Sequence, residues 1–111
     1  MGTYLTKELV AVTPLSTTID LLYTTPASKT TIVKTILLAN KGATDARVTI
    51  YLVPAGYDVS ETKKIFGEVL VSANTTTDID TAIAVPANNK LYFTCSTLNA
   101  INVHLTGIEI G

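Results

Sequence analysis

The stretch that decides the fold is NKGATDARVTIYLVPAG, Asn40–Gly56. Its middle part places an apolar side chain at every second position, and Arg47, Thr49 and Tyr51 stand between them. The apolar set is Ala46, Val48, Ile50 and Leu52. A period of two is typical of a β-strand with one face buried. Both ends carry Asn, Gly, Asp or Pro, the residues that favour turns, so the stretch predicts a turn, a strand and a second turn.

The same pattern recurs on both sides of this stretch. Turn-forming clusters (TTPASK, SANTTT, VPANNK and STLNA) separate further alternating segments at residues 19–23, 31–39, 65–71, 79–85, 91–96 and 103–110, with a first strand near 5–12. About eight strands at a spacing of 8–12 residues predict an all-β fold, an antiparallel, jelly-roll-like β-sandwich. We expect one domain over residues 1–111, because a chain of this length holds a single core.

The apolar phase of each strand predicts the core. The predicted core residues are Ile36, Leu38, Val48, Ile50, Leu52, Ile83, Phe93, Val103 and Leu105. In the last strand, Ile108 and Ile110 are out of phase with Val103 and Leu105, which predicts a bulge at Gly107 that changes the buried face. A single helical turn, capped by Ser60, is expected within residues 59–66.

The composition restricts the class of partner. Hydrophobic residues make up 47% of the chain, charged residues only 15%, and the net charge is −1. Such a chain has no long-range field for nucleic acid or an anionic membrane, so we expect neither as a partner. No stretch approaches the roughly 18 apolar residues of a membrane span or resembles a secretory signal, which predicts a soluble protein. The surplus of apolar residues over what one small domain can bury instead favours association with other protein chains.

Few residues could carry chemistry. His104 is the only histidine and lies at an outward position, which disfavours a metal site. Cys95 shares the face of Leu91 and Phe93, where a free cysteine is typically a core residue. Asp78 and Asp80 lie about 7 Å apart on one side of a strand, an arrangement more typical of a solvated face than of paired catalytic carboxylates. The sequence therefore predicts no enzyme, no cofactor and no metal.

Three motifs carry a resemblance to a known family. They are L-Y-x-x-P-x-x-K-x-x-I-V-K-x-I-x-x-x-N from Leu22, V-T-I-Y-L-V-P-x-G from Val48, and N-V-x-x-x-G-x-E from Asn102. Over residues 19–110 the chain resembles small all-β structural proteins of tailed bacteriophages. The resemblance implies a β-sandwich or jelly-roll component of the virion, commonly oligomeric, which is assembled in the host cytoplasm.

The resemblance leaves several roles open. The chain could be a capsid cement or decoration protein bound between subunits of the major capsid protein, or a neck, tail or fibre module. A carbohydrate-binding sandwich is a third possibility, for which Tyr4, Tyr51, Tyr57 and Tyr92 could supply rings. We expect a homo-oligomer, with a trimer preferred because three-fold positions are common in virions. The densest charged segment is the predicted partner-binding surface, namely Tyr57, Asp58, Glu61, Lys63 and Lys64.

Overall fold

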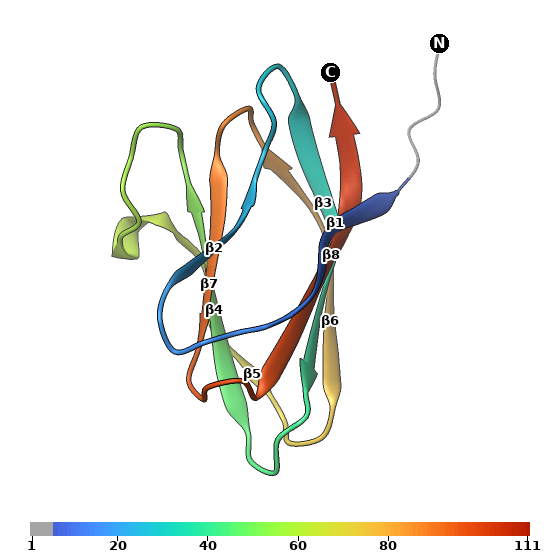
Figure 1. Cartoon of the computed structure of the whole chain (residues 1–111), viewed down its shortest axis with the longest axis vertical. Helices are drawn as coiled ribbons and strands as arrows, with labels where there is room; N and C mark the ends of the chain where they lie inside the picture. The colour runs from blue at the N-terminus through green and yellow to red at the C-terminus, as the bar shows by residue number, and fades with distance from the viewer. Residues whose placement is uncertain (1–5) are drawn as a thin grey trace.

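The computed structural model describes residues 6–111, in which the regular elements are eight strands and one short 3₁₀ turn. The elements are β1 (Lys7–Pro14), β2 (Asp20–Thr24), β3 (Thr30–Asn40), β4 (Ala46–Val53), the 3₁₀ turn η1 (Glu61–Lys63), β5 (Lys64–Val71), β6 (Thr76–Val85), β7 (Lys90–Cys95) and β8 (Ile101–Ile110). Figure 1 shows two sheets facing each other. Sheet A has the order β1-β8-β3-β6, and sheet B has the order β2-β7-β4-β5. The predicted all-β sandwich is confirmed.

The strand pairs are nested within one another along the chain. β4 pairs with β5, β3 with β6, β2 with β7 and β1 with β8, all antiparallel. Pairing of β3 with β8 then completes sheet A, and pairing of β4 with β7 completes sheet B. The chain therefore folds back on itself around the connection between β4 and β5.

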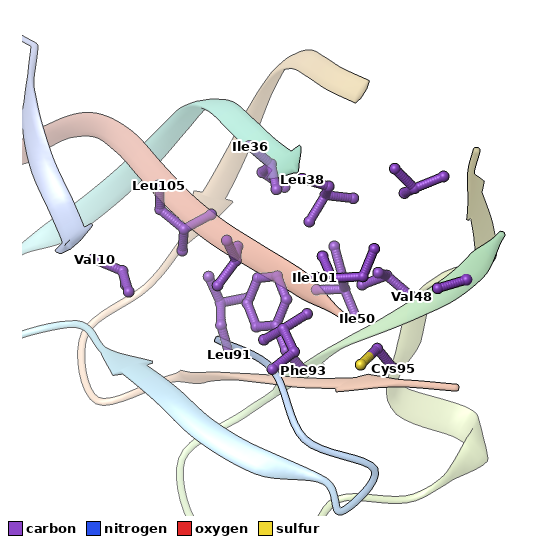
Figure 2. Close-up of a cluster of buried hydrophobic side chains, with 14 of the residues drawn as sticks. Val10, Ile36, Leu38, Val48, Ile50, Leu91, Phe93, Cys95, Ile101 and Leu105 are labelled. Atoms are coloured by element: carbon purple, nitrogen blue, oxygen red, sulfur yellow. The ribbon is translucent and has the colours of Figure 1, made fainter. Parts of the chain in front are cut away.

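The core lies between the sheets and matches the predicted faces closely. Seven of the nine predicted core residues are buried; Leu52 and Ile83 are partly buried and pack against the others. Figure 2 shows side chains of both sheets converging on this layer, with the ring of Phe93 among them. Ile101 from β8 and Leu91 from β7 complete its centre. Each such side chain contributes about 1.5–3 kcal/mol when it leaves water.

Five tight turns share one construction. In each, the N–H of the fourth residue donates to the carbonyl of the first, over distances of 3.0–3.3 Å. The third residue has a positive φ, between 57° and 82°, a conformation that Asn and Gly adopt most readily among common residues. These third residues are Ser28, Gly56, Asn74, Asn88 and Asn99. The Pro, Asn and Gly clusters of the sequence thus correctly located the strand ends.

The predicted bulge at Gly107 is wrong. β8 keeps one phase from Ile101 to Gly107, and the register shift lies opposite, between Val33 and Thr35 of β3. The extra residue is Lys34, which changes the buried face of β3 instead. A Cβ on Gly107 would lie 2.2 Å from the carbonyl oxygen of Ile32, so glycine is required there for close approach of the two strands.

The outer face of β4 is less exposed than its alternation predicts. Tyr51 and Val53 are buried although they point away from the core, because η1 and the connection that contains it lie against β4. The single helical turn is present where expected, at Glu61–Lys63. Ser60 occupies its N-cap position but bonds the hydroxyl of Thr62 rather than capping the turn. The predicted first strand corresponds to β1, and Leu5 lies outside the described residues.

Candidate functional site

The predicted partner-binding residues lie close together along the chain, on the connection between β4 and β5 and, for Lys64, at the first residue of β5. The Lys63 ammonium stands 4.8 Å from the ring centroid of Tyr57, within the range of a cation–π interaction. Lys64 donates to Glu61 at 2.9 Å, and this hydrogen bond raises the pKa of the Lys64 ammonium. Tyr57 is 63% exposed and Asp58 is exposed. The segment presents one ring and mixed charges to solvent, as a contact surface can, and its role as the partner-binding site stays a prediction.

The outer face of sheet A carries a second candidate surface. A shallow hollow of about 260 Å³ spans the sheet there, and we call it the sheet A hollow. Its lining consists of Val12, Leu37, Ala39, Thr76, Asn102, Val103 and His104. Val12, at its edge, is 64% exposed. Asp78 lies directly beside Leu37 in the strand register, so an apolar floor adjoins an acidic rim.

A smaller hollow lies on the outer face of sheet B. It measures about 150 Å³, and its walls come from Arg47, Thr49, Glu68, Thr94, Cys95 and Ser96. Glu68 has a φ of 48°, at a point where β5 shifts register against β4. The backbone N–H of Glu68 donates to the Thr49 hydroxyl at 3.3 Å. Its walls are mostly polar and already bonded to one another, which makes it a weaker docking surface than the sheet A hollow.

His104 and the two aspartates face solvent from sheet A. His104 Nε2 lies 2.9 Å from Glu8 Oε2, an exposed pair between neighbouring strands. Asp78 and Asp80 point to the outer side of β6, and Asp80 accepts a hydrogen bond from Thr35 at 3.3 Å. Among residues 6–111, no three His, Cys, Asp or Glu side chains gather as they would around a metal ion.

The thiol of Cys95 is enclosed. It is buried in the core, as predicted, and Sγ donates to the carbonyl of Thr97 at 2.9 Å. Burial raises the pKa of this thiol, so the reactive thiolate is disfavoured at neutral pH. Cys95 thus has the surroundings of a packing residue.

The sequence did not reveal a polar network at one end of the sandwich. Glu109, with a side chain only 14% exposed, accepts from Lys7 Nζ at 2.8 Å and from the Tyr23 hydroxyl. The bond from Lys7, followed by that from Tyr23, lowers the pKa of Glu109. Burial, with the nearby carboxylate, raises the pKa of Tyr23 to about 12. Thr31 and Thr25 extend the network to the carbonyl of Val85, which ties both sheets together.

A second unpredicted polar centre is Asn40. It is only 3% exposed, and its Nδ2 donates to the carbonyls of Thr44 and Val71, each at 2.9 Å. Its Oδ1 accepts from the N–H of Gly42 at 2.8 Å. One side chain therefore fixes the β3–β4 turn and holds it against the end of β5.

The tyrosines do not form one exposed platform. Tyr51 is buried, Tyr92 is half-buried, and only Tyr57 among the described candidates is well exposed. Tyr4 lies outside the described residues. A sugar-binding surface of stacked rings therefore gains no support from residues 6–111.

Comparison with known proteins gives no further identification. The chain matches no protein-family model, no curated protein and no solved structure. No helix within residues 6–111 is long and apolar enough to cross a membrane.

Proposed function

We propose that the protein is a structural component of a tailed-bacteriophage virion, acting as a capsid decoration or cement protein. In this role it binds where subunits of the major capsid protein meet and stabilises the capsid without catalysis. It would act in the virion as a homo-oligomer, with neither nucleic acid nor membrane as partner.

The strand order supports this proposal. Eight strands in two sheets, nested as β1–β8, β2–β7, β3–β6 and β4–β5, follow the plan of a jelly roll. Jelly rolls occur in viral capsid proteins and in lectins. We therefore propose the jelly roll as the finer description of the sandwich. A fold does not determine a function, so the surface of the sandwich gives the stronger support.

The observation that carries the proposal is the sheet A hollow. An apolar depression that crosses an exposed sheet can receive a side chain from a neighbouring protein. Around the hollow, His104 pairs with Glu8 and Asp80 accepts from the Thr35 hydroxyl, so these titratable groups do not converge on one point as a catalytic centre requires. A surface of this kind suits a protein that is held in place by shape and apolar contact.

The alternative is a neck, tail or fibre module. The same hollow and the exposed Tyr57 segment would serve contacts in a tail as well as on a capsid. The two roles differ in stoichiometry, because a cement protein accompanies the whole capsid lattice whereas a neck or tail module occurs in a few copies.

The test is to purify particles from a lysate of cells that express the phage genome encoding this chain, and to measure its copies per major capsid subunit by quantitative mass spectrometry. A fixed ratio to the capsid subunit, together with lower heat resistance of particles that lack the chain, is expected for a cement protein. A few copies per particle would establish the alternative. Absence of the chain from particles that are otherwise complete would refute both.

The sheet A hollow can be tested in the same system. Leu37→Lys places a charge on its floor, and Leu70→Lys provides a matched control on the outer face of sheet B, since Leu70 is exposed at 46%. Particles lacking the chain should take up the control at the wild-type level and the Leu37 variant at least tenfold less. Equal uptake of the two folded variants would remove the hollow from the interface.

A further inference from the structure

Among the strands of sheet A, β1 has the largest share of exposed residues, five of its eight. Of its eight residues only Val10 is buried, and Leu9 packs partly against the core. Glu8, Ala11 and Val12 are exposed. A strand with so few buried apolar contacts opens more readily than the strands at the centre of a sheet.

The pairing of β1 with β8 is also interrupted. The register shifts twice, between Glu8 and Val10 and again between Val10 and Thr13. Among the described strands β1 pairs only with β8, whereas β8 also pairs along its whole length with β3. β8 therefore remains held in the sheet when β1 leaves its edge, and that edge is then open to another strand.

The chain after β1 is anchored independently. The N–H of Leu15 donates to the carbonyl of Ile101 at 2.8 Å, and its own carbonyl accepts from the N–H of Asn99 at 3.0 Å. The next carbonyl, that of Ser16, accepts from Cys95 at 3.0 Å, and the Leu15 side chain is buried. A hinge consequently falls at Pro14, where β1 ends, and opening there leaves the rest of the sandwich in place.

Side chains of β1 recognise β8 specifically. Lys7 pairs with Glu109 at 2.8 Å, Glu8 with His104 at 2.9 Å, and Val10 lies opposite Leu105. The three partners belong to β8, and a second copy of the chain presents the same three. The β8 edge of one copy is thus complementary to the β1 of another.

We propose that β1 is an exchangeable strand, which leaves the β8 edge of its own chain and pairs with β8 of a second copy. Exchange between two copies closes a dimer, and cyclic exchange among three copies closes a ring with identical contacts. This inference deepens the proposed function, on whose assembly role it rests, by naming the strand that links the copies.

The experiment distinguishes exchanged from unexchanged pairing by the product of one disulfide. Glu8 and Thr106 lie directly opposite each other on the outer face, so Glu8→Cys with Thr106→Cys is introduced in a Cys95→Ala background. Oxidised glutathione takes the two electrons and two protons of the thiol pair and is itself reduced. Pairing within one chain gives a covalent monomer, and exchanged pairing gives a covalent dimer or larger ring on a non-reducing gel.

While the covalent dimer is the minor product, the fraction of chains in it should rise about tenfold for a tenfold increase in protein concentration, by mass action. Exclusively covalent monomer at every concentration, including after equilibration at pH 4 and return to neutral pH, would overturn the proposal. The single variants Glu8→Cys and Thr106→Cys report disulfides formed by random collision. If they yield as much covalent dimer as the pair, exchange is equally refuted.

A measurement on the unmodified chain guards against misfolding of the cysteine variants. In hydrogen exchange at neutral pH, the amides of β1 should exchange at least tenfold faster than those of β3. Amides of β1 as protected as those of β3 would contradict the proposed opening. Both assays use the purified protein alone. A negative result in them would refute strand exchange but not the proposed virion role, which is tested separately by the copy number in particles.

Discussion

Replacing Asn40 tests whether a single buried amide holds one end of the sandwich. Asn40→Ala removes two donated bonds, to Thr44 and Val71, and one accepted bond, from Gly42. At about 1 kcal/mol net for each bond, and more for groups left buried without a partner, the expected loss is about 3–5 kcal/mol. For a domain of this size that corresponds to a fall in Tm of roughly 12 °C or more, taking about 4 °C per kcal/mol.

Asn40→Asp separates hydrogen bonding from volume. The carboxylate has the shape of the amide and still accepts from Gly42, but it faces the carbonyl oxygens of Thr44 and Val71 without a proton to donate. At neutral pH we expect it to be at least as destabilising as Asn40→Ala. Repulsion raises the pKa of this carboxyl in the folded state, so stability should be regained as the pH falls and the protonated group donates again.

The assay is urea unfolding monitored by circular dichroism. The free energy of unfolding should have the same slope against urea concentration in the variant and the wild type, so that the two can be compared as two-state transitions. The matched control is Asn102→Ala. Asn102 is half-buried, and within residues 6–111 its side chain makes one hydrogen bond, which it accepts from the surface amine of Lys41. This variant should change the free energy of unfolding by less than about 0.5 kcal/mol. If Asn40→Ala loses less than about 1 kcal/mol, or if Asn40→Asp shows no recovery in acid, the bonds of Asn40 do not have the assigned role.

Four further predictions concern packing and titration. Ile50→Ala, in the buried core, should cost about 2–5 kcal/mol by thermal unfolding, and a loss below about 0.5 kcal/mol would indicate a surface position instead. Gly107→Ala should cost about 1–3 kcal/mol, because its Cβ would meet the Ile32 carbonyl, whereas Gly67→Ala, near only the flexible end of Lys64, should cost less; equal losses would contradict this account. The pKa of Glu109 is lowered in the folded state, so the Glu109 carboxylate should stabilise the protein fully above the ordinary value of 4.5 and progressively less as the pH falls below it. In Glu109→Gln, this loss of stability below pH 4.5 should disappear. The pKa of Tyr23 is raised to about 12 from the ordinary value of 10, so stability should fall, by at most about 3 kcal/mol, as the pH rises from 10 to 12. Tyr23→Phe should abolish this loss, and an unchanged alkaline profile in that variant would count against the prediction.

Local patterns were sufficient to predict the strands and most of the core. Alternation over a few residues predicted the buried faces of Val48 and Phe93, and clusters of Pro, Asn and Gly located the turns. β8 was misread because Ile108 and Ile110 are apolar, whereas the side chain that turns inward is the charged Glu109. Its partners Lys7 and Tyr23 are 102 and 86 residues away in the chain, so no local pattern indicates them.

Of the two candidate surfaces, one consists of residues close together in the sequence and the other of residues far apart. The segment from Tyr57 to Lys64 could be proposed as a contact surface from the sequence, because its charged residues are neighbours along the chain, and their pairing in the structure follows from that proximity. The sheet A hollow could not be predicted, since it combines Val12, Leu37 and Asn102 from three strands whose order depends on the whole topology. The sequence marks Asn40 as a turn and motif residue but not as a buried hydrogen-bonding centre, because its bond to Val71 crosses 31 positions.

The nested pairing also sets an order of assembly for the newly made chain. Only β4 and β5 pair across a short connection, so this hairpin forms with the smallest loss of chain entropy. Each outer pair then encloses a longer loop, and the pair formed by β1 and β8 encloses nearly the whole chain. Proteins dominated by such distant pairings fold slowly, on a scale of about milliseconds to seconds. On a ribosome, β1 emerges before the other seven described strands, and its partner β8 is the last of these to be synthesised. Until β8 has emerged, the hydrogen-bonding groups of β1 lack the partner that they have in the folded sandwich.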